Sequence, residues 1–163
     1  MATELKNLSE FNAEQIPSAA GMKFGIVVAE WNTEVTEALS EGAITLLKQF
    51  NAHKIEKITV PGTFELAMGA QFLLEKAEVD AVICIGCVIQ GETKHFDFIC
   101  NASAHGITDL NLKYNKPVIF GVLTPNTMQQ AIDRAGGKHG NKGHEAAITA
   151  IKMVALKNSI LSR

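Results

Sequence analysis

Residues 91–95 bring a glycine, a carboxylate, a hydroxyl, an ammonium group and an imidazole together directly after the apolar run of residues 81–89. If this segment opens a helix, its free backbone amides could hold a phosphate or a similar oxyanion. His95 would lie in the first turn, where the helix dipole disfavours an added proton and keeps the imidazole competent for proton transfer near neutrality. Taken alone, the segment is explained as well by an ordinary helix start with Thr93 as its N-cap residue.

An anion bound at this segment needs positive charge from elsewhere in the chain. The side chain of Glu92 does not suit an anion site, so binding would fall mainly to backbone amides, and the glycine-rich segment 133–143 offers cations. These cations are Arg134, Lys138 and Lys142. The whole chain carries 15 basic and 17 acidic side chains, which gives no basic field for nucleic acid or an anionic membrane surface. We therefore expect a local anion site, and neither nucleic acid nor a membrane as a partner.

Aromatic and acidic residues accompany the other apolar runs. Trp31, the only tryptophan of the chain, follows the first run, and Phe64 and Glu65 follow the second. Phe120 belongs to the last run. Each has an ordinary explanation, a helix-start charge for Glu65 and a core position for the aromatic residues. Their coincidence near one edge of a sheet favours a binding site for a planar, hydroxylated ligand.

Thiol and metal chemistry are not indicated by the sequence. Cys84 and Cys87 have a Cys-x-x-Cys spacing, but they lie inside an apolar run, whereas redox pairs usually lie at an exposed helix start. We expect these two cysteines to be buried, reduced and structural. The 5 histidines lack the spacing with cysteine or carboxylate that a metal site requires, so no metal is expected.

Hydropathy bears on the location of the protein. No apolar run approaches the roughly 18 residues that span a bilayer, and residues 1–17 contain no hydrophobic secretory core. We therefore expect the protein in the cytoplasm.

The apolar runs alternate with segments of helical periodicity along the chain. Strands are expected at residues 22–30, 53–60, 81–89 and 116–124, and helices at 32–50, 63–77, 94–114, 127–134 and 143–158. This alternation predicts an α/β fold with a four-stranded parallel sheet covered by helices on both faces. Residues 21–163 are expected to form a single domain, preceded by an N-terminal arm of residues 1–20 that could be flexible or pack on a neighbouring subunit.

Ligands of open parallel sheets bind at the carboxyl ends of the strands. The segments expected there are residues 30–32, 61–65, 90–95 and 123–126. A flavin-binding electron carrier would share the fold, but it would need a phosphate-binding loop after the first strand. The sequence AEWNTEV at that place offers no such loop.

Four segments of the chain closely resemble lumazine synthases, the penultimate enzymes of riboflavin biosynthesis. These segments are PGTFE, GCVIQGETKHFDFIC, PVIFGVLT and RAGGKHGNKGHEAAITAI, and the likeness extends from about Phe24 to the C-terminus. The resemblance implies a flavodoxin-like three-layer α/β/α sandwich without bound flavin, whose sheet an N-terminal segment could extend. It also implies a cofactor-free transferase that condenses 5-amino-6-(D-ribitylamino)uracil with 3,4-dihydroxy-2-butanone 4-phosphate. The products are 6,7-dimethyl-8-ribityllumazine, phosphate and water.

The resemblance assigns the pyrimidine substrate to three parts of the chain. Trp31 takes the place of the aromatic residue that stacks on the pyrimidine, where phenylalanine is also common. The segment that holds the ribityl chain corresponds to Thr63, Phe64 and Glu65. The strand end that meets the pyrimidine edge through its backbone corresponds to Cys87, Val88 and Ile89.

The resemblance also assigns the reacting centre and the phosphate. His95 corresponds to the proton-transfer residue and Phe120 to a second aromatic wall. The phosphate side corresponds to Glu92, Thr93, Arg134 and Lys142. The chain departs from the family pattern at two positions, since Gln90 stands where relatives often carry arginine and Glu92 where they often carry a small residue. Both changes leave the backbone role of this loop intact.

The same resemblance implies an assembly. In the family, the residues after the fourth strand reach the site of the adjacent subunit, so we expect a homopentamer with active sites shared between subunits. The short connection of residues 136–143 resembles that of relatives which build icosahedral shells of sixty subunits. A structural shell protein with an inactive site is the alternative, and intact Glu65, His95 and Arg134 argue against it.

Overall fold

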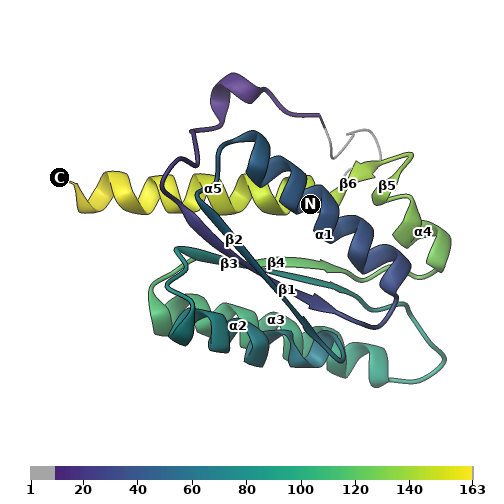
Figure 1. Ribbon diagram of the computed structural model, residues 1–163. Coiled ribbons are helices and arrows are strands. Elements are labelled where there is room, and N and C mark those ends of the chain that lie inside the picture. The colour runs from purple at the N-terminus through teal and green to yellow at the C-terminus, as the bar shows by residue number, and fades with distance from the viewer. Residues whose placement is uncertain (1–9, 163) are drawn as a thin grey trace.

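The computed structural model describes residues 10–162, which form three layers around one sheet (Figure 1). The strands are β1 (Lys23–Ala29), β2 (Lys54–Val60), β3 (Ala81–Cys87) and β4 (Val118–Leu123). They are parallel and lie in the order β2-β1-β3-β4, so β2 and β4 are the edges. The predicted α/β fold with a four-stranded parallel sheet is thus confirmed. The expected extension of the sheet by an N-terminal segment is not formed by residues 10–20, and residues 1–9 lie outside the described residues.

Two pairs of helices cover the sheet. Helices α1 (Thr33–Gln49) and α5 (Lys142–Leu161) pack on one face, and α2 (Leu66–Lys76) and α3 (His95–Tyr114) pack on the other. Every residue of β3 is buried, because this central strand is covered on both faces. The strand was predictable because this complete burial appears in the sequence as an unbroken apolar run.

The crossing of α1 and α5 depends on glycine. A Cβ atom on Gly143 would lie 1.9 Å from the carbonyl oxygen of Leu39, so only glycine allows the two backbones to approach this closely. Beside it, the side chain of Asn141 accepts a 2.7 Å hydrogen bond from the Gly143 amide and donates a 2.9 Å bond to the Ala38 carbonyl. The start of α5 is therefore fixed against α1.

Several boundaries differ from the predicted ones. The third strand ends at Cys87 instead of residue 89, and the fourth helix, α4 (Met128–Ile132), is shorter than residues 127–134. A 3₁₀ turn, η2 (Thr63–Glu65), precedes α2. The glycine-rich segment forms a small antiparallel hairpin of β5 (Ala135–Gly137) and β6 (Gly140–Asn141), which the sequence analysis did not predict.

The segment before β1 contributes to the core. It contains the 3₁₀ turn η1 (Ala13–Gln15), and Ile16 and Ala19 are buried among the side chains beneath α1 and α5. None of the helices in residues 10–162 combines the length and the apolar character needed to cross a membrane.

Candidate active site

A cavity of about 720 Å³ opens at the carboxyl ends of β1, β2 and β3. It is lined by Trp31, Asn32, Gly62, Thr63, Phe64, Glu65, Cys87, Val88, Ile89, His95 and Ile99. Eight of the predicted site residues are in this set, and they come from three separate strand-to-helix connections. The structure therefore brings together residues that lie up to 64 positions apart in the sequence, from Trp31 to His95.

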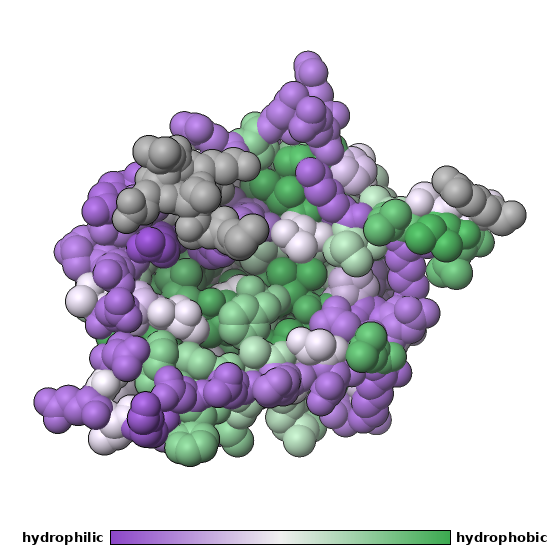
Figure 2. Space-filling model, turned by 180° about the vertical axis from the view of Figure 1, so that it is seen from behind, coloured by the Kyte–Doolittle hydropathy of each residue, from purple (hydrophilic) through white to green (hydrophobic). Residues whose placement is uncertain are grey.

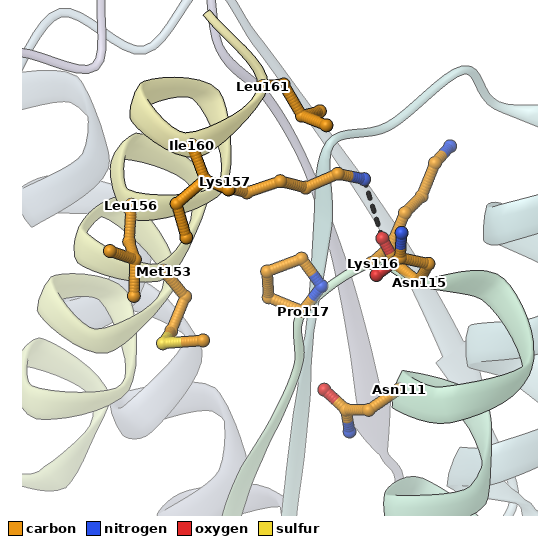
Figure 3. Close-up of a pocket in the computed structure, with 9 residues that line it drawn as sticks. All are labelled: Asn111, Asn115, Lys116, Pro117, Met153, Leu156, Lys157, Ile160 and Leu161. Carbon is orange, nitrogen blue, oxygen red and sulfur yellow. Dashed lines mark hydrogen bonds between the residues drawn. The ribbon is translucent and has the colours of Figure 1, made fainter. Parts of the chain in front are cut away.

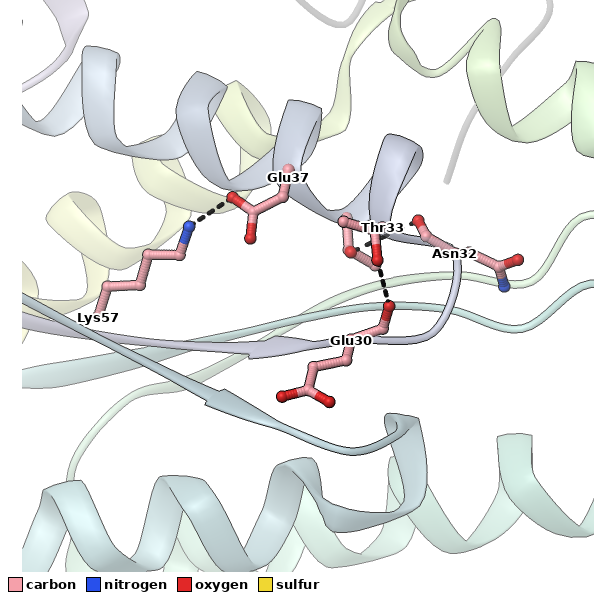
Figure 4. A network of polar contacts seen from close by, with 6 residues as sticks. Glu30, Asn32, Thr33, Glu37 and Lys57 are labelled. Carbon is pink, nitrogen blue, oxygen red and sulfur yellow. Dashed lines mark hydrogen bonds and ion pairs between the residues drawn. The ribbon is translucent and has the colours of Figure 1, made fainter.

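The first wall of the cavity is the turn after β1. Asn32 adopts the left-handed conformation, with φ 60° and ψ 46°, which asparagine tolerates better than most residues. Its side-chain amide donates a 2.8 Å hydrogen bond to the carbonyl of Cys87. Thr33 Oγ1 donates a 2.6 Å bond to the carbonyl of Glu30 (Figure 4). These bonds fix the turn that carries Trp31, whose side chain is 73% exposed and free to cover a planar ligand.

The second wall is the η2 turn. Thr63 is buried against β3 at Gly86, where an added Cβ would lie 2.8 Å from Thr63 Oγ1. The Ser103 hydroxyl of α3 lies 2.7 Å from the Ile99 carbonyl of its own helix and 3.1 Å from the Thr63 carbonyl, so its one proton is shared between two acceptors, one of which belongs to this turn. Glu65 Oε2 lies 3.0 Å from the place of a Cβ on Gly62, so the carboxylate folds back toward the mouth of the cavity. No cation among residues 10–162 forms an ion pair with Glu65.

The third wall is the start of α3. His95 is the first helical residue, is exposed, and lines the cavity. The expected N-cap position of Thr93 is wrong by one residue: Lys94 is the N-cap and provides no side-chain cap, although Thr93 Oγ1 accepts a long 3.4 Å bond from the His95 amide. The Asp97 amide donates to the Lys94 carbonyl at 3.1 Å, so this helix start offers only part of its amides to an external acceptor.

The loop before α3 is held to the end of β4. The amide of Val88 donates to the Leu123 carbonyl at 2.9 Å, and the amide of Gln90 donates to the Pro125 carbonyl at 3.0 Å. Glu92 and Thr93 are exposed and do not line the cavity. Their side chains are therefore no part of its walls within one subunit.

The remaining predicted residues lie elsewhere on the subunit. Phe120 and Lys142 line a depression of about 450 Å³ along the open edge of β4, where Lys142 Nζ forms a 2.6 Å ion pair with Glu145. Arg134 lines neither space, and its Nη1 donates to the Gln130 carbonyl at 3.0 Å. Within one protomer these three residues do not complete the cavity.

A third hollow, of about 330 Å³, lies between the end of α3, the start of β4 and the last turns of α5 (Figure 3). Lys157 Nζ spans one side of it with a 2.6 Å bond to the Asn115 carbonyl. None of the predicted site residues lines this hollow. The chemistry-bearing side chains are thus concentrated at the other end of the sheet.

Comparison with known proteins identifies the family. The sequence model of a family described as 6,7-dimethyl-8-ribityllumazine synthase matches residues 21–158. The chain belongs to the lumazine synthase family. It is 63% identical over 157 residues to a protein of Cytophaga hutchinsonii with that name, covering 95% of this chain and 98% of the relative. Proteins of the same name from Flavobacterium johnsoniae and Parabacteroides distasonis are 57% and 55% identical, covering 96% and 94% of this chain, and 84% and 98% of the relatives.

The cysteines of this lumazine synthase-family chain are structural, as predicted. Cys84 and Cys87 are both buried and free. Burial raises the pKa of the Cys84 thiol to about 12 and that of the Cys87 thiol to about 11. Neither thiol provides a nucleophile near neutrality, so the Cys-x-x-Cys spacing reflects two positions of one buried strand.

Three residues of the lumazine synthase cavity were not assigned a role from the sequence: Asn32, Gly62 and Ile99. Asn32 could have been found, because an asparagine between a buried strand and a helix is a common left-handed turn residue. Ile99 could not, because one apolar residue in a long helix carries no signal of a cavity beside it.

Proposed function

We propose that the chain catalyses the condensation of 5-amino-6-(D-ribitylamino)uracil with 3,4-dihydroxy-2-butanone 4-phosphate to 6,7-dimethyl-8-ribityllumazine. The observation that carries the proposal is the cavity at the strand ends, which gathers an indole, a carboxylate, a free strand end and an imidazole in a chain of this family. A pocket of this kind, apolar with a few convergent polar groups, suits a planar ligand with a polar tail.

The pyrimidine substrate would lie against the Trp31 indole. Its ring edge would meet the backbone of residues 87–89, which line the cavity where the chain leaves the sheet after Cys87. The ribityl hydroxyls would reach the η2 turn, where the Glu65 carboxylate has no ion-pair partner among the described residues and can accept hydrogen bonds.

The reaction needs positioning and modest proton transfer. The aromatic amine attacks the ketone, and the resulting carbinolamine loses water to give an imine. Phosphate then leaves by elimination, and ring closure expels the last water. His95, at the cavity wall and open to solvent, would move protons between these intermediates. Most of the acceleration would come from holding both substrates in reacting geometry.

The phosphate would be held by two sets of groups. The amides near Glu92 and Thr93 that are not bonded within the chain would provide one set. The cations Arg134 and Lys142 would provide the other from an adjacent subunit, together with the aromatic wall of Phe120. The support for a shared site is that these three residues lie apart from the cavity, two of them along the open edge of β4. Figure 2 shows the molecule from behind, where apolar residues gather in a hollow with a hydrophilic rim.

A homopentamer would allow every site to be shared between two subunits, because a head-to-tail contact that closes by rotation gives every cavity a neighbouring subunit. We further propose that the pentamers form an icosahedral shell of sixty subunits in the cytoplasm. The support is the short connection between α4 and α5, where the β5-β6 hairpin adds no insertion.

The test is an assay with both substrates that follows the fluorescence of the lumazine product and the release of phosphate. The proposal expects product only when both substrates are present, with one phosphate released per product. Absence of turnover at saturating concentrations of both substrates would overturn it.

A further inference from the structure

The three cations of the segment 133–143 have different surroundings. Lys138 Nζ lies 3.2 Å from a carboxylate oxygen of Asp133, and Lys142 is paired with Glu145. Arg134 forms no ion pair with any carboxylate of residues 10–162, and its recorded side-chain bond goes to the Gln130 carbonyl. Most of the guanidinium donors therefore remain for an external anion.

The neighbour of Arg134 is an unusually buried acid. Asp133 is only 8% exposed, although it ends the five-residue helix α4 at the surface. Its carboxylate accepts a 2.9 Å hydrogen bond from Gln129 Nε2, besides the ion pair with Lys138. The bond from Gln129, followed by the nearby Lys138, holds the pKa of Asp133 below its ordinary value, so the carboxylate stays charged.

The backbone around Asp133 closes the hairpin that carries Arg134. The carbonyl of Asp133 accepts a 2.8 Å bond from the His139 amide, and the carbonyl of Arg134 accepts a 2.8 Å bond from the Lys142 amide. Gly137 packs directly on this corner, since an added Cβ would lie 2.8 Å from the Asp133 Cα. Asp133 therefore connects α4, the hairpin tip and the start of the segment that leads to α5.

We propose that Asp133 is a positioning residue for Arg134. Its carboxylate binds Gln129 on α4 and Lys138 on the hairpin, and thereby fixes the backbone from which the guanidinium extends toward the phosphate. Because Lys138 is engaged by Asp133, the phosphate is recognised by the planar, bidentate group of Arg134 instead of the ammonium group of Lys138. This inference rests on the proposed role of Arg134 with the phosphorylated ketone.

The test is a double-mutant cycle on the assembled enzyme with Asp133→Ala, Arg134→Ala and the double variant. We expect Asp133→Ala to raise the KM for the phosphorylated ketone about five- to twentyfold, as expected for a misplaced binding group, and to leave the KM for the pyrimidine substrate within about twofold. In the Arg134→Ala background the same substitution should change neither value further, because Asp133 acts through Arg134. Binding of inorganic phosphate, measured by calorimetry, should follow the same pattern.

Two further variants separate positioning from general stability. Asp133→Asn keeps an acceptor for Gln129 but loses the attraction of Lys138, so its KM should fall between those of the wild type and Asp133→Ala. Glu37→Ala removes a comparable surface partner, that of Lys57 on β2, and should leave both KM values unchanged. Additive effects in the cycle, or equal rises of both KM values, would overturn the inference. An unchanged ketone KM in Arg134→Ala alone would instead refute the proposed role of Arg134, and the inference with it.

Discussion

At the scale of single residues, the proposed chemistry depends on a few side chains that line the cavity. His95 is exposed at the first turn of α3, Glu65 has no ion-pair partner among residues 10–162, and Trp31 offers an uncovered indole. None of the three is needed for the core, so their substitution should affect catalysis more than stability. A loss of activity in a variant of one of these residues can therefore be attributed to binding or catalysis and not to unfolding.

Replacement of His95 by alanine should lower kcat by about ten- to a hundredfold, the modest contribution of a positioned acid or base. Both KM values should change little, because Trp31 and the η2 turn keep their positions. The measurement is a steady-state assay over a range of pH, with Lys94→Ala as the neighbouring control. If kcat and the pH–rate profile both stay as in the wild type, His95 has no part in the mechanism.

The thiols give a prediction that is independent of activity. The folded chain keeps Cys84 and Cys87 protonated well above their ordinary pKa of 9.0. Because folding raises the pKa of both thiols, the unfolded chain loses these protons at a lower pH than the folded chain does. The two thiols therefore leave the free energy of unfolding unchanged below about pH 9 and lower it as the pH rises toward the folded pKa values.

Because Cys84 and Cys87 are buried, a thiol reagent at pH 8 should modify Cys100 first, and the other two only on unfolding. Rapid modification of all three cysteines in the folded protein would contradict the burial of Cys84 and Cys87 in β3.

At the scale of elements, the four strands and five helices were predictable from the sequence, whereas contacts between residues distant in sequence were not. The buried strands are continuous apolar runs and the long helices have a clear apolar stripe. The β5-β6 hairpin escaped prediction because its residues are mostly glycine and polar. It is defined by bonds such as that from the Lys142 amide to Arg134, and by packing on Asp133.

The cavity likewise has some residues that could be predicted from the sequence and others whose contacts appear only in the fold. Trp31, Glu65 and His95 were predictable because each follows an apolar run at a predicted strand end. Ser103 was not, because a serine inside a helix does not reveal that its hydroxyl reaches the Thr63 carbonyl of another element. Its role in holding two cavity walls together is visible only in the folded chain.

The α1–α5 crossing can be tested with glycine substitutions. Gly143→Ala should lower the free energy of unfolding by about 3 kcal/mol or more, because the new methyl group collides with the Leu39 carbonyl and the helices must separate. Gly91→Ala is the matched control, since a Cβ there meets no atom within 4 Å. Urea unfolding of both variants measures the difference. Equal stability of the two would show that the crossing is looser than described.

At the scale of the whole molecule, the subunit has an incomplete site and an unpaired sheet edge. The cavity is lined by the residues proposed to bind the pyrimidine and to transfer protons, while Arg134, Lys142 and Phe120 lie outside it. In the proposed closed ring, each β4 edge would lie beside the cavity of a neighbour, which would complete the site and cover this edge.

Light scattering of the purified protein should give a mass of about five chains or of a closed multiple of five, with sixty expected for the proposed shell. A mass near five chains refutes the shell but keeps the shared site. A mass of one chain for an active enzyme refutes both, because no subunit could then complete the cavity of another.

The central claim, an active site completed by two subunits, is tested most directly by mixing variants. His95→Ala and Arg134→Ala subunits are co-expressed with different tags, and hybrid assemblies are isolated and assayed for the lumazine product at a concentration of the phosphorylated ketone well below the KM of Arg134→Ala. If His95 and Arg134 reach each site from different subunits, about a quarter of the sites in an equal random mixture contain both intact residues. The hybrids should then recover about a quarter of wild-type activity, well above either variant alone. Activity equal to the mean of the two variants would place both residues in the same subunit and contradict the account.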